Sequence, residues 1–139
     1  MKSLKKVTLV ILIIGYLIAG ANHFYNPPSY WHIIPAYIPL PHLMNSLSGA
    51  LEIFFALIMT SPKTRQLAIW GITLMLIAFI PVHIDMVIRA PFMLGGSIMV
   101  TPLIAWLRLL VFQPLLILWV WSYRNTDEQQ ECHILKALF

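Results

Sequence analysis

Charged residues are scarce in this chain. Of its 139 residues, nine are Lys or Arg and five are Asp or Glu, so charged residues make up 10% of the sequence and hydrophobic residues 60%. A soluble globular domain carries about 25% charged residues. The composition therefore indicates an integral membrane protein whose main partner is the lipid bilayer. The basic residues form no continuous stripe of the kind that follows a phosphate backbone, so we expect no nucleic-acid partner.

Cysteine and catalytic motifs are scarce as well. Cys132 is the single cysteine, which excludes an intrachain disulfide and a Cys-x-x-Cys redox pair. The sequence has no Gly-rich phosphate loop, no Gly-x-Ser-x-Gly nucleophile motif and no His-Glu-x-x-His zinc motif. It therefore assigns no catalytic residue. We interpret the chain as non-catalytic on its own, which leaves open a role as a subunit of a membrane oxidoreductase.

Four apolar stretches are long enough to cross a bilayer, whose hydrocarbon core of about 30 Å needs about 20 helical residues. The first follows a basic N-terminus and resembles a signal peptide, but its hydrophobic character continues to Phe24, so we interpret it as a membrane helix. We predict an all-α bundle of four transmembrane helices, followed by a cytoplasmic tail at residues 125–139. The helices lie at about residues 4–24, 43–60, 67–88 and 102–123, within one domain of residues 1–124.

The first loop, residues 25–42, is rich in proline and aromatic residues. Proline forbids a continuous helix, and Tyr and Trp settle at the lipid–water interface. We expect an interfacial lid over one mouth of the bundle, with Ser29 capping a helical turn at residues 30–34. The residues that carry this prediction are Pro27, Pro28, Pro35, Pro39, Pro41, Tyr25, Tyr30, Trp31 and Tyr37.

Two further prolines fall inside predicted helices. Pro81 and Pro114 lack the N–H of an ordinary residue and are expected to kink the third and fourth helices. Residues 89–101 contain glycine and proline, and we expect an irregular loop there.

Positive charge is distributed unevenly between the two faces of the predicted bundle. Seven Lys and Arg residues flank one face, whereas Arg89 alone flanks the other and Arg108 lies inside the fourth helix. Cytoplasmic segments carry the excess of Lys and Arg in membrane proteins. We therefore predict that both termini are cytoplasmic. The seven residues are Lys2, Lys5, Lys6, Lys63, Arg65, Arg124 and Lys136.

Glu52 lies near the centre of the second predicted helix. A charge at the middle of a bilayer costs about 2.5–3.5 kcal/mol and needs a partner, a proton or a wet cavity. Glu52 shares one helical face with small and polar residues, which lets neighbouring helices approach closely, so we expect this face to point into the bundle. Its other members are Asn45, Ser48, Gly49 and Ala56.

Arg108 is the predicted partner of Glu52, either directly or through Gln113 or water. Such an ion pair would fix the register of the helices. The same residues alternatively line a ligand pocket or a proton path, because intramembrane charges usually mark function. Asp85 is a competitor for Arg108, or it pairs with Arg89 one helical turn later.

Two histidines near the same face of the membrane complete the candidate polar cluster. His23 ends the first helix and His83 lies near the end of the third. Neutral imidazole is a common ligand of haem and metals. No ligand-spacing motif supports such a site around His23, His83 and Asp85, so we expect neither a metal nor a haem.

Several short motifs occur in order along the chain. They are Gly20-Ala-Asn-His23-Phe24, Pro27, Tyr30, Ile33-Ile34-Pro35, Ile38-Pro39-x-Pro41, Ser48-Gly49-x-x-Glu52, Lys63-Thr64-Arg65, Pro81-x-His83-Ile84, Trp106-Leu107-Arg108 and Gln113. Together they resemble the DoxX-like family of small bacterial membrane proteins. The resemblance covers most of residues 20–122 and implies a four-helix protein of the bacterial inner membrane, whose relatives are linked to membrane redox complexes. His83 stands where the family has Asn, and the family lends no catalytic role to Glu52 or Arg108.

Three functions agree with these observations. The first is an accessory or redox-associated subunit whose outer-facing polar pocket holds a lipophilic ligand, with a quinone as one candidate; Glu52, Arg108 and Gln113 would bind its head group. The second is a small proton-coupled transporter or channel element. The third is a structural scaffold for another membrane enzyme. A membrane complex or a second copy of the chain is the expected protein partner.

Overall fold

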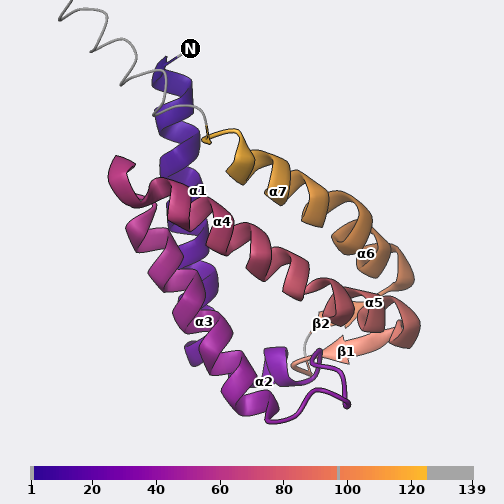
Figure 1. Ribbon diagram of the computed structural model, residues 1–139. Helices are drawn as coiled ribbons and strands as arrows, with labels where there is room; N and C mark the ends of the chain where they lie inside the picture. Colours follow the sequence, from indigo (N-terminus) through magenta and orange to yellow (C-terminus); the bar gives the residue numbers. More distant parts are fainter. Residues whose placement is uncertain (1, 97, 125–139) are drawn as a thin grey trace, which may run out of the picture.

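The computed structural model describes residues 2–96 and 98–124. Most of them are helical, and one small sheet lies between the helices (Figure 1). In chain order the elements are α1 (Lys2–Tyr25), α2 (Pro27–Trp31), α3 (Pro41–Ile58), α4 (Pro62–Ala78), α5 (Ile80–Arg89), β1 (Phe92–Leu94), β2 (Ile98–Val100), α6 (Pro102–Leu107), the π-helix η1 (Arg108–Phe112) and α7 (Gln113–Trp121).

Three helical stretches of the described chain are long and apolar enough to cross a membrane. They are Ser3–Tyr25, Pro62–Arg89 and Pro102–Trp121. This confirms the helical class and the membrane character that the composition predicts. Helix α3 has 18 residues, but its polar residues, among them Asn45 and Glu52, lower its hydropathy, and a fourth span stays a prediction.

The helices are arranged as two pairs that diverge from one another (Figure 1). Helix α1 packs along α3 over much of its length, and α4 and α5 pack against the stretch from α6 to α7. Helix α4 also contacts α3 near the turn that joins them. The pairs therefore meet at this end and separate toward the end that carries α2 and the β-strands, which we call the lid end.

Two glycines set the close contact between α1 and α3. A Cβ atom added to Gly49 would lie 2.6 Å from the Cβ of His23 and 2.9 Å from the carbonyl oxygen of Gly20. A Cβ atom added to Gly20 would lie 2.8 Å from the carbonyl oxygen of Gly49. Glycine at both positions lets the backbones touch, as small residues do between membrane helices.

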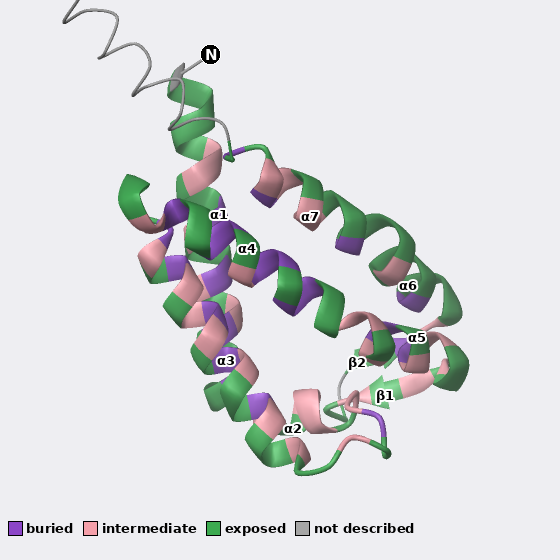
Figure 2. Cartoon of the chain, viewed as in Figure 1, coloured by how far each residue is buried: buried purple, intermediate pink, exposed green. Residues whose placement is uncertain are grey.

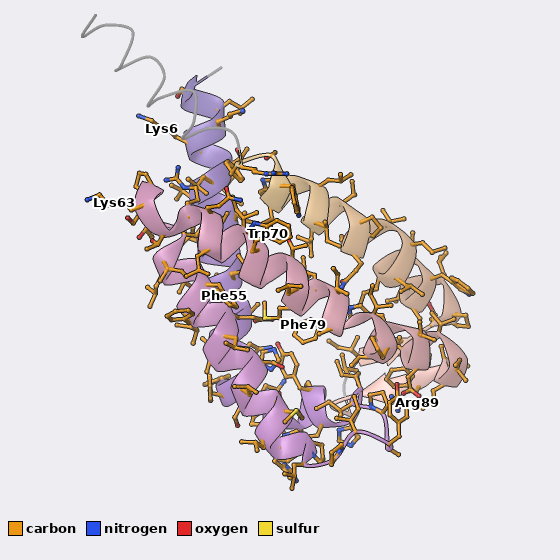
Figure 3. The ribbon with its side chains drawn as sticks, viewed as in Figure 1. Lys6, Phe55, Lys63, Trp70, Phe79 and Arg89 are labelled. Carbon is orange, nitrogen blue, oxygen red and sulfur yellow. The ribbon has the colours of Figure 1, made fainter. Side chains whose placement is uncertain are left out.

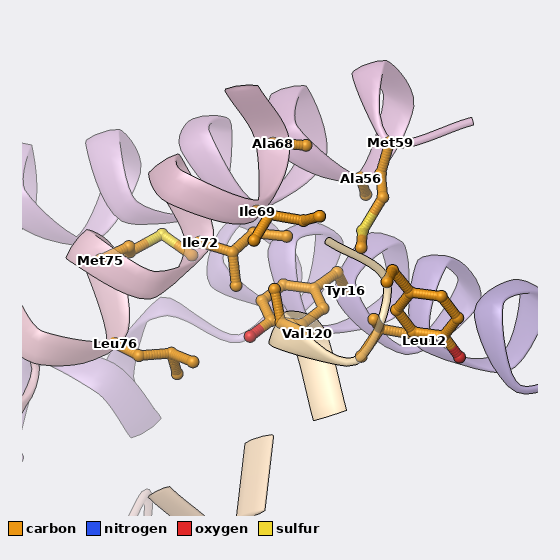
Figure 4. Packing of buried hydrophobic residues seen from close by; sticks show 11 residues of the cluster. Leu12, Tyr16, Ala56, Met59, Ala68, Ile69, Ile72, Met75, Leu76 and Val120 are labelled. Atoms are coloured by element: carbon orange, nitrogen blue, oxygen red, sulfur yellow. The ribbon is translucent and has the colours of Figure 1, made fainter. Parts of the chain in front are cut away.

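The main hydrophobic core lies where the two helix pairs meet. It contains buried residues from α1, α3, α4 and the end of the described chain, and Figure 4 shows several of them pointing toward one another; we call it the core cluster. Figure 2 places the buried residues on the inward faces of α3 and α4, whereas most of α6 is exposed. The buried members are Leu12, Tyr16, Ala56, Met59, Ala68, Ile69, Ile72, Met75, Leu76, Val120 and Tyr123.

A second, smaller hydrophobic cluster closes the lid end. Met86 of α5, Val100 of β2 and Ala105 of α6 are its buried members, and Ile33 of the first loop packs against them; we call it the lid cluster. The two clusters thus join the helix pairs at opposite ends of the molecule.

Basic side chains mark the end opposite the lid. Figure 3 shows Lys6 and Lys63 at this end, which we call the basic end, and Arg89 at the lid end. Aromatic residues gather at the basic end: the Trp70 and Trp121 rings lie 5.1 Å apart. The arrangement agrees with the predicted charge asymmetry, while the orientation in a bilayer stays a prediction. Lys136 and the tail lie outside the described residues.

The loop predicted at residues 89–101 contains a short antiparallel hairpin. Phe92 pairs with Val100, and Leu94 pairs with Ile98. Each strand has only three residues, so alternation is too short to recognise in the sequence. The turn packs on α2, because a Cβ atom at Gly95 would lie 2.4 Å from the Ser29 hydroxyl oxygen. An all-α description is therefore wrong for this segment.

Backbone irregularities accompany the internal prolines. The predicted third helix is broken at Phe79, two residues before Pro81. In the fourth, the stretch Arg108–Phe112 is π-helical and ends just before Pro114, with the Gln113 N–H donating to the Arg108 carbonyl. The helical turn in the first loop forms at Pro27–Trp31, earlier than predicted, and Ser29 lies inside it instead of capping it.

We expect Gly49→Ala to destabilise the protein, because the added methyl group overlaps the backbone of α1. Overpacking of this kind costs about 1–3 kcal/mol. Gly15→Ala is the matched control, since a Cβ atom there meets nothing within 4 Å. Thermal unfolding of the purified protein in detergent measures both. Equal melting temperatures for the two variants would contradict the close contact.

Candidate functional site

Two cavities lie between the core cluster and the lid cluster. One, of about 520 Å³, is lined by α1, α3, α4, α5 and the first loop; we call it the α3-side cavity. The other, of about 370 Å³, is lined by α1, α4 and the segment from η1 to α7; we call it the α7-side cavity. These volumes fall in the usual range for small-molecule sites. The residues that line both cavities are Ala19, Glu52, Phe79, His83 and Arg108.

Glu52 lies at the junction of the two cavities, as expected for the face it shares with Asn45 and Gly49. Its side chain is only 9% exposed. One carboxylate oxygen, Oε1, lies 3.7 Å from Nε2 of His23. The other, Oε2, is buried and accepts no hydrogen bond from any described residue. Glu52 is therefore only half compensated.

Arg108 does not form the predicted ion pair with Glu52. Among the described residues, the Glu52 carboxylate lies next to His23, and Asp85 forms an ion pair with Arg89. Arg108 is exposed and lines both cavities. Its guanidinium group offers only donors. The two predicted partners thus face the same cavities without neutralising one another.

His23 is held in place by Asn45 on the neighbouring helix. The His23 ring nitrogen Nδ1 lies 2.8 Å from Oδ1 of Asn45, and the Asn45 amide donates to the His23 carbonyl at 2.9 Å. The ring stacks on Tyr30 of α2 at a centroid distance of 3.7 Å. Tyr30 in turn accepts a hydrogen bond from Asn22. These contacts fix the position of His23 beside Glu52.

Three buried polar atoms around the α7-side cavity have no hydrogen-bond partner among the described residues. They are the Tyr16 hydroxyl, Glu52 Oε2 and His83 Nδ1, from α1, α3 and α5 respectively. Buried polar groups in native proteins are almost always paired, so each exception requires an explanation. The three residues that carry these atoms line one cavity, which is therefore the candidate site.

Tyr16 was missed by the sequence analysis. It lies in the middle of a long apolar run, where a tyrosine is normally interpreted as a packing residue. Tyr16 does belong to the core cluster. The available signal was its spacing: Tyr16 precedes His23 by seven residues, which places both on one face of a helix.

Gln113 lines the α7-side cavity, and its amide nitrogen is bonded to the backbone of α4. It donates a hydrogen bond to the carbonyl oxygen of Leu76, in the last turn of α4 before the break at Phe79. Gln113 thus ties the fourth helix to the third at their two irregular segments. It forms no bridge between Glu52 and Arg108 in the described structure.

The first loop covers the α3-side cavity, and Arg89 fastens it. Ile33 lines this cavity. The Arg89 guanidinium donates to the carbonyl oxygens of His32 at 2.8 Å and Ile33 at 3.2 Å. Asp85 pairs with Arg89, which settles the two alternatives for its partner, and it does not line either cavity. Ser48 lines the α3-side cavity.

The described part of the chain contains no group of three or more His, Cys, Asp or Glu side chains that could hold a metal ion.

Comparison with known proteins gives one match. A family model described as a domain of unknown function (DUF8561) matches residues 12–124. No curated protein and no solved structure matches the chain. The resemblance to the DoxX-like family is not tested by these findings and stays a prediction.

We expect Asn45→Leu to lower the free energy of unfolding by about 1–3 kcal/mol, because a buried ring nitrogen and a carbonyl lose their partners. Ser46→Ala is the control: its exposed hydroxyl bonds only to the His42 carbonyl, so the change should stay within about 0.5 kcal/mol. Denaturant titration of the two variants measures the difference. An unchanged free energy of unfolding in Asn45→Leu would show that the hydrogen bonds to Asn45 do not hold His23 in place.

We expect Arg89→Met to loosen the first loop, because the carbonyls of His32 and Ile33 lose their donor. Hydrogen–deuterium exchange should become faster across residues 30–38 and stay unchanged in α3. Lys63→Met, at the basic end, is the control and should leave exchange in the loop as it is. Unchanged exchange in Arg89→Met would show that other contacts fasten the lid.

Proposed function

The chain belongs to the DUF8561 family, whose description assigns no activity, and we propose that it is an accessory membrane subunit that binds a lipophilic ligand with a polar head group. A quinone is one candidate, in line with the resemblance to DoxX-like proteins. In this proposal α1, α3, the stretch α4–α5 and the stretch α6–α7 all cross the bacterial inner membrane. Both termini are cytoplasmic, and the cavities lie toward the outer side.

The observation that carries the proposal is the set of unpartnered polar atoms around the α7-side cavity. A buried polar group without a partner costs about 1–3 kcal/mol. Tyr16, Glu52 and His83 each contribute one atom without a partner among the described residues, and the exposed Arg108 adds a guanidinium group that only donates. A ligand head group that bonds to several of them offsets this cost, which makes the cavity a binding site rather than a packing defect.

The surroundings of the cavities support a lipophilic body for the ligand. Leu47 and Leu74 line the α3-side cavity and are also exposed on the surface of the molecule. Ile11 and Phe112 do the same at the α7-side cavity. Both cavities thus reach surfaces that face lipid in the proposed arrangement, and a hydrophobic ligand enters sideways from the bilayer.

A proton-coupled transporter is the second candidate, favoured by the row of Asn45, His23 and Glu52. A transmembrane proton path needs polar groups on both sides of Glu52. Toward the basic end, however, the core cluster fills the space with apolar residues such as Leu12, Ile72 and Val120. This favours ligand binding over proton transport.

Binding tests separate the candidates. A decyl-substituted benzoquinone should quench tryptophan fluorescence of the purified protein, because Trp119 lines the α7-side cavity. Arg108→Gln should weaken binding about tenfold or more, the usual worth of a hydrogen bond from a charged group. Lys63→Gln at the basic end is the control and should bind like the wild type.

Two outcomes would contradict the proposal. One is a pure preparation without copurified lipophile in mass spectrometry of its lipid extract that also fails to bind the quinone. The other is proton flux in proteoliposomes that disappears in Glu52→Gln, which would favour the transporter.

A further inference from the structure

Helix α4 runs between the two cavities. It lies between α3 and α7 (Figure 1) and contacts both of them. Leu76 of α4 lines the α7-side cavity only, whereas Phe79, at the break that ends α4, lines both cavities. The residues of α4 that line the α3-side cavity only recur at helical spacing and so share one face; they are Gly71, Leu74, Met75 and Ala78. The cavities therefore lie on different sides of α4 and meet near its end.

The two cavities share their charged side chains. Glu52 of α3 and Arg108 of η1 line both cavities, together with His83 of α5. Ligand sites are mostly apolar, with a few polar side chains that fix the orientation of the ligand. The junction of the cavities is therefore the position where a single polar head group meets the polar side chains common to both.

Away from the junction the walls of both cavities are mostly apolar. Two of the polar side chains found there are bonded within the protein: Gln113 donates to the Leu76 carbonyl, and His23 pairs with Asn45. Each cavity thus offers its own apolar wall to a hydrocarbon chain. The apolar walls include Ile11, Leu12 and Leu116 in the α7-side cavity, and Leu47, Leu51 and Phe55 in the α3-side cavity.

Each cavity also reaches the lipid-facing surface at a place of its own. The α7-side cavity, of about 370 Å³, reaches it at Ile11 and Phe112, and the α3-side cavity, of about 520 Å³, reaches it at Leu47 and Leu74. A ligand with one chain and its head group at the junction makes apolar contacts in one cavity only. The walls of the other cavity then forfeit their dispersion contacts with the ligand. A ligand with two chains makes such contacts in both.

We propose that the ligand carries two apolar chains on one polar head group, with the head group at the junction and one chain in each cavity. This inference rests on the proposed function and specifies its ligand class, an amphiphile with two chains in place of a lipophile with one. Applied to the quinone candidate, it requires a ring with alkyl chains on opposite sides, because the cavities leave the junction on different sides of α4.

Two isomers of a substituted quinone test this with the wild-type protein. They are 2,5-dihexyl-1,4-benzoquinone, with two short chains, and 2-dodecyl-1,4-benzoquinone, with one long chain. Because the isomers have the same head group and the same number of carbon atoms, a difference in affinity reports the arrangement of the chains. We expect the dihexyl isomer to bind about tenfold or more tightly, since it makes dispersion contacts in both cavities. Equilibrium dialysis at a fixed detergent concentration measures affinity and stoichiometry.

Two variants obstruct the cavities one at a time. Gly15 lines only the α7-side cavity, and a Cβ atom there meets nothing within 4 Å, so Gly15→Leu extends into open space. Ala78 lines only the α3-side cavity, which Ala78→Leu narrows. Each variant should weaken binding of the dihexyl isomer about tenfold, because both of its chains then cannot fit without overpacking. The dodecyl isomer uses one cavity, so at most one of the two variants should weaken it.

Ala50→Leu is the matched control. Ala50 is exposed on α3 and lines neither cavity, so this variant should bind both isomers like the wild type. The comparison of the isomers needs only the wild-type protein, and it therefore decides the question even if a cavity variant fails to fold.

The outcomes distinguish this inference from the proposed function. If the dodecyl isomer binds as tightly as the dihexyl isomer, the inference is wrong and the lipophile site of the proposed function stands. The same conclusion follows if only one of the two folded cavity variants weakens the dihexyl isomer, or if two dodecyl molecules bind per protein as tightly as one dihexyl molecule. Binding of neither isomer would overturn the proposed function, and this inference with it.

Discussion

The close contact between α1 and α3 is the constraint on which the site depends. The backbones touch at Gly20 and Gly49, and this brings His23 of one helix against Asn45 and Glu52 of the other. A bulkier side chain at either glycine would push the two helices apart. The hydrogen bonds between them would then become too long to form. The contact between Glu52 and His23 thus depends on two residues without side chains that lie on the same helix faces.

The cavities follow from the way the two helix pairs are joined. The core cluster holds them together near the basic end, and the lid cluster with Arg89 holds them at the other. Between these points the side chains, most of them apolar, do not fill the space between α3, α4 and η1. Apolar packing at both ends therefore leaves cavities in the middle whose mostly apolar walls carry a few polar groups, among them Glu52, His83 and Arg108.

The sequence predicts the helices well, because long apolar runs leave few alternatives. It also predicts the inward face of α3, since small and polar residues recur there at helical spacing. The partner of Glu52 was not predictable in the same way. Charge alone predicts Arg108 as the partner. The close contact between α1 and α3 instead places His23 next to Glu52.

Other features depend on the three-dimensional arrangement of the chain and leave no recognisable pattern in the local sequence. The hairpin is too short for strand periodicity, and Tyr16 is indistinguishable from a packing residue until the cavity beside it is seen. The prolines indicate where the helices are irregular. They do not indicate that one irregularity is a break and the other a π-helix.

The π-helical segment has a consequence for the angular order of residues in the fourth helix. Residues five apart on an α-helix are rotated by about 140° from one another and point to different sides. Arg108 and Gln113 are five apart, yet both line the α7-side cavity, because the wider π-helical turn bonds residue i to residue i+5. Removing one residue from Arg108–Phe112 would restore regular winding and turn the guanidinium group toward a different neighbour. The π-helical segment thus behaves as a one-residue insertion in an α-helix. Because of it, the side chains of Arg108 and Gln113 line the same cavity.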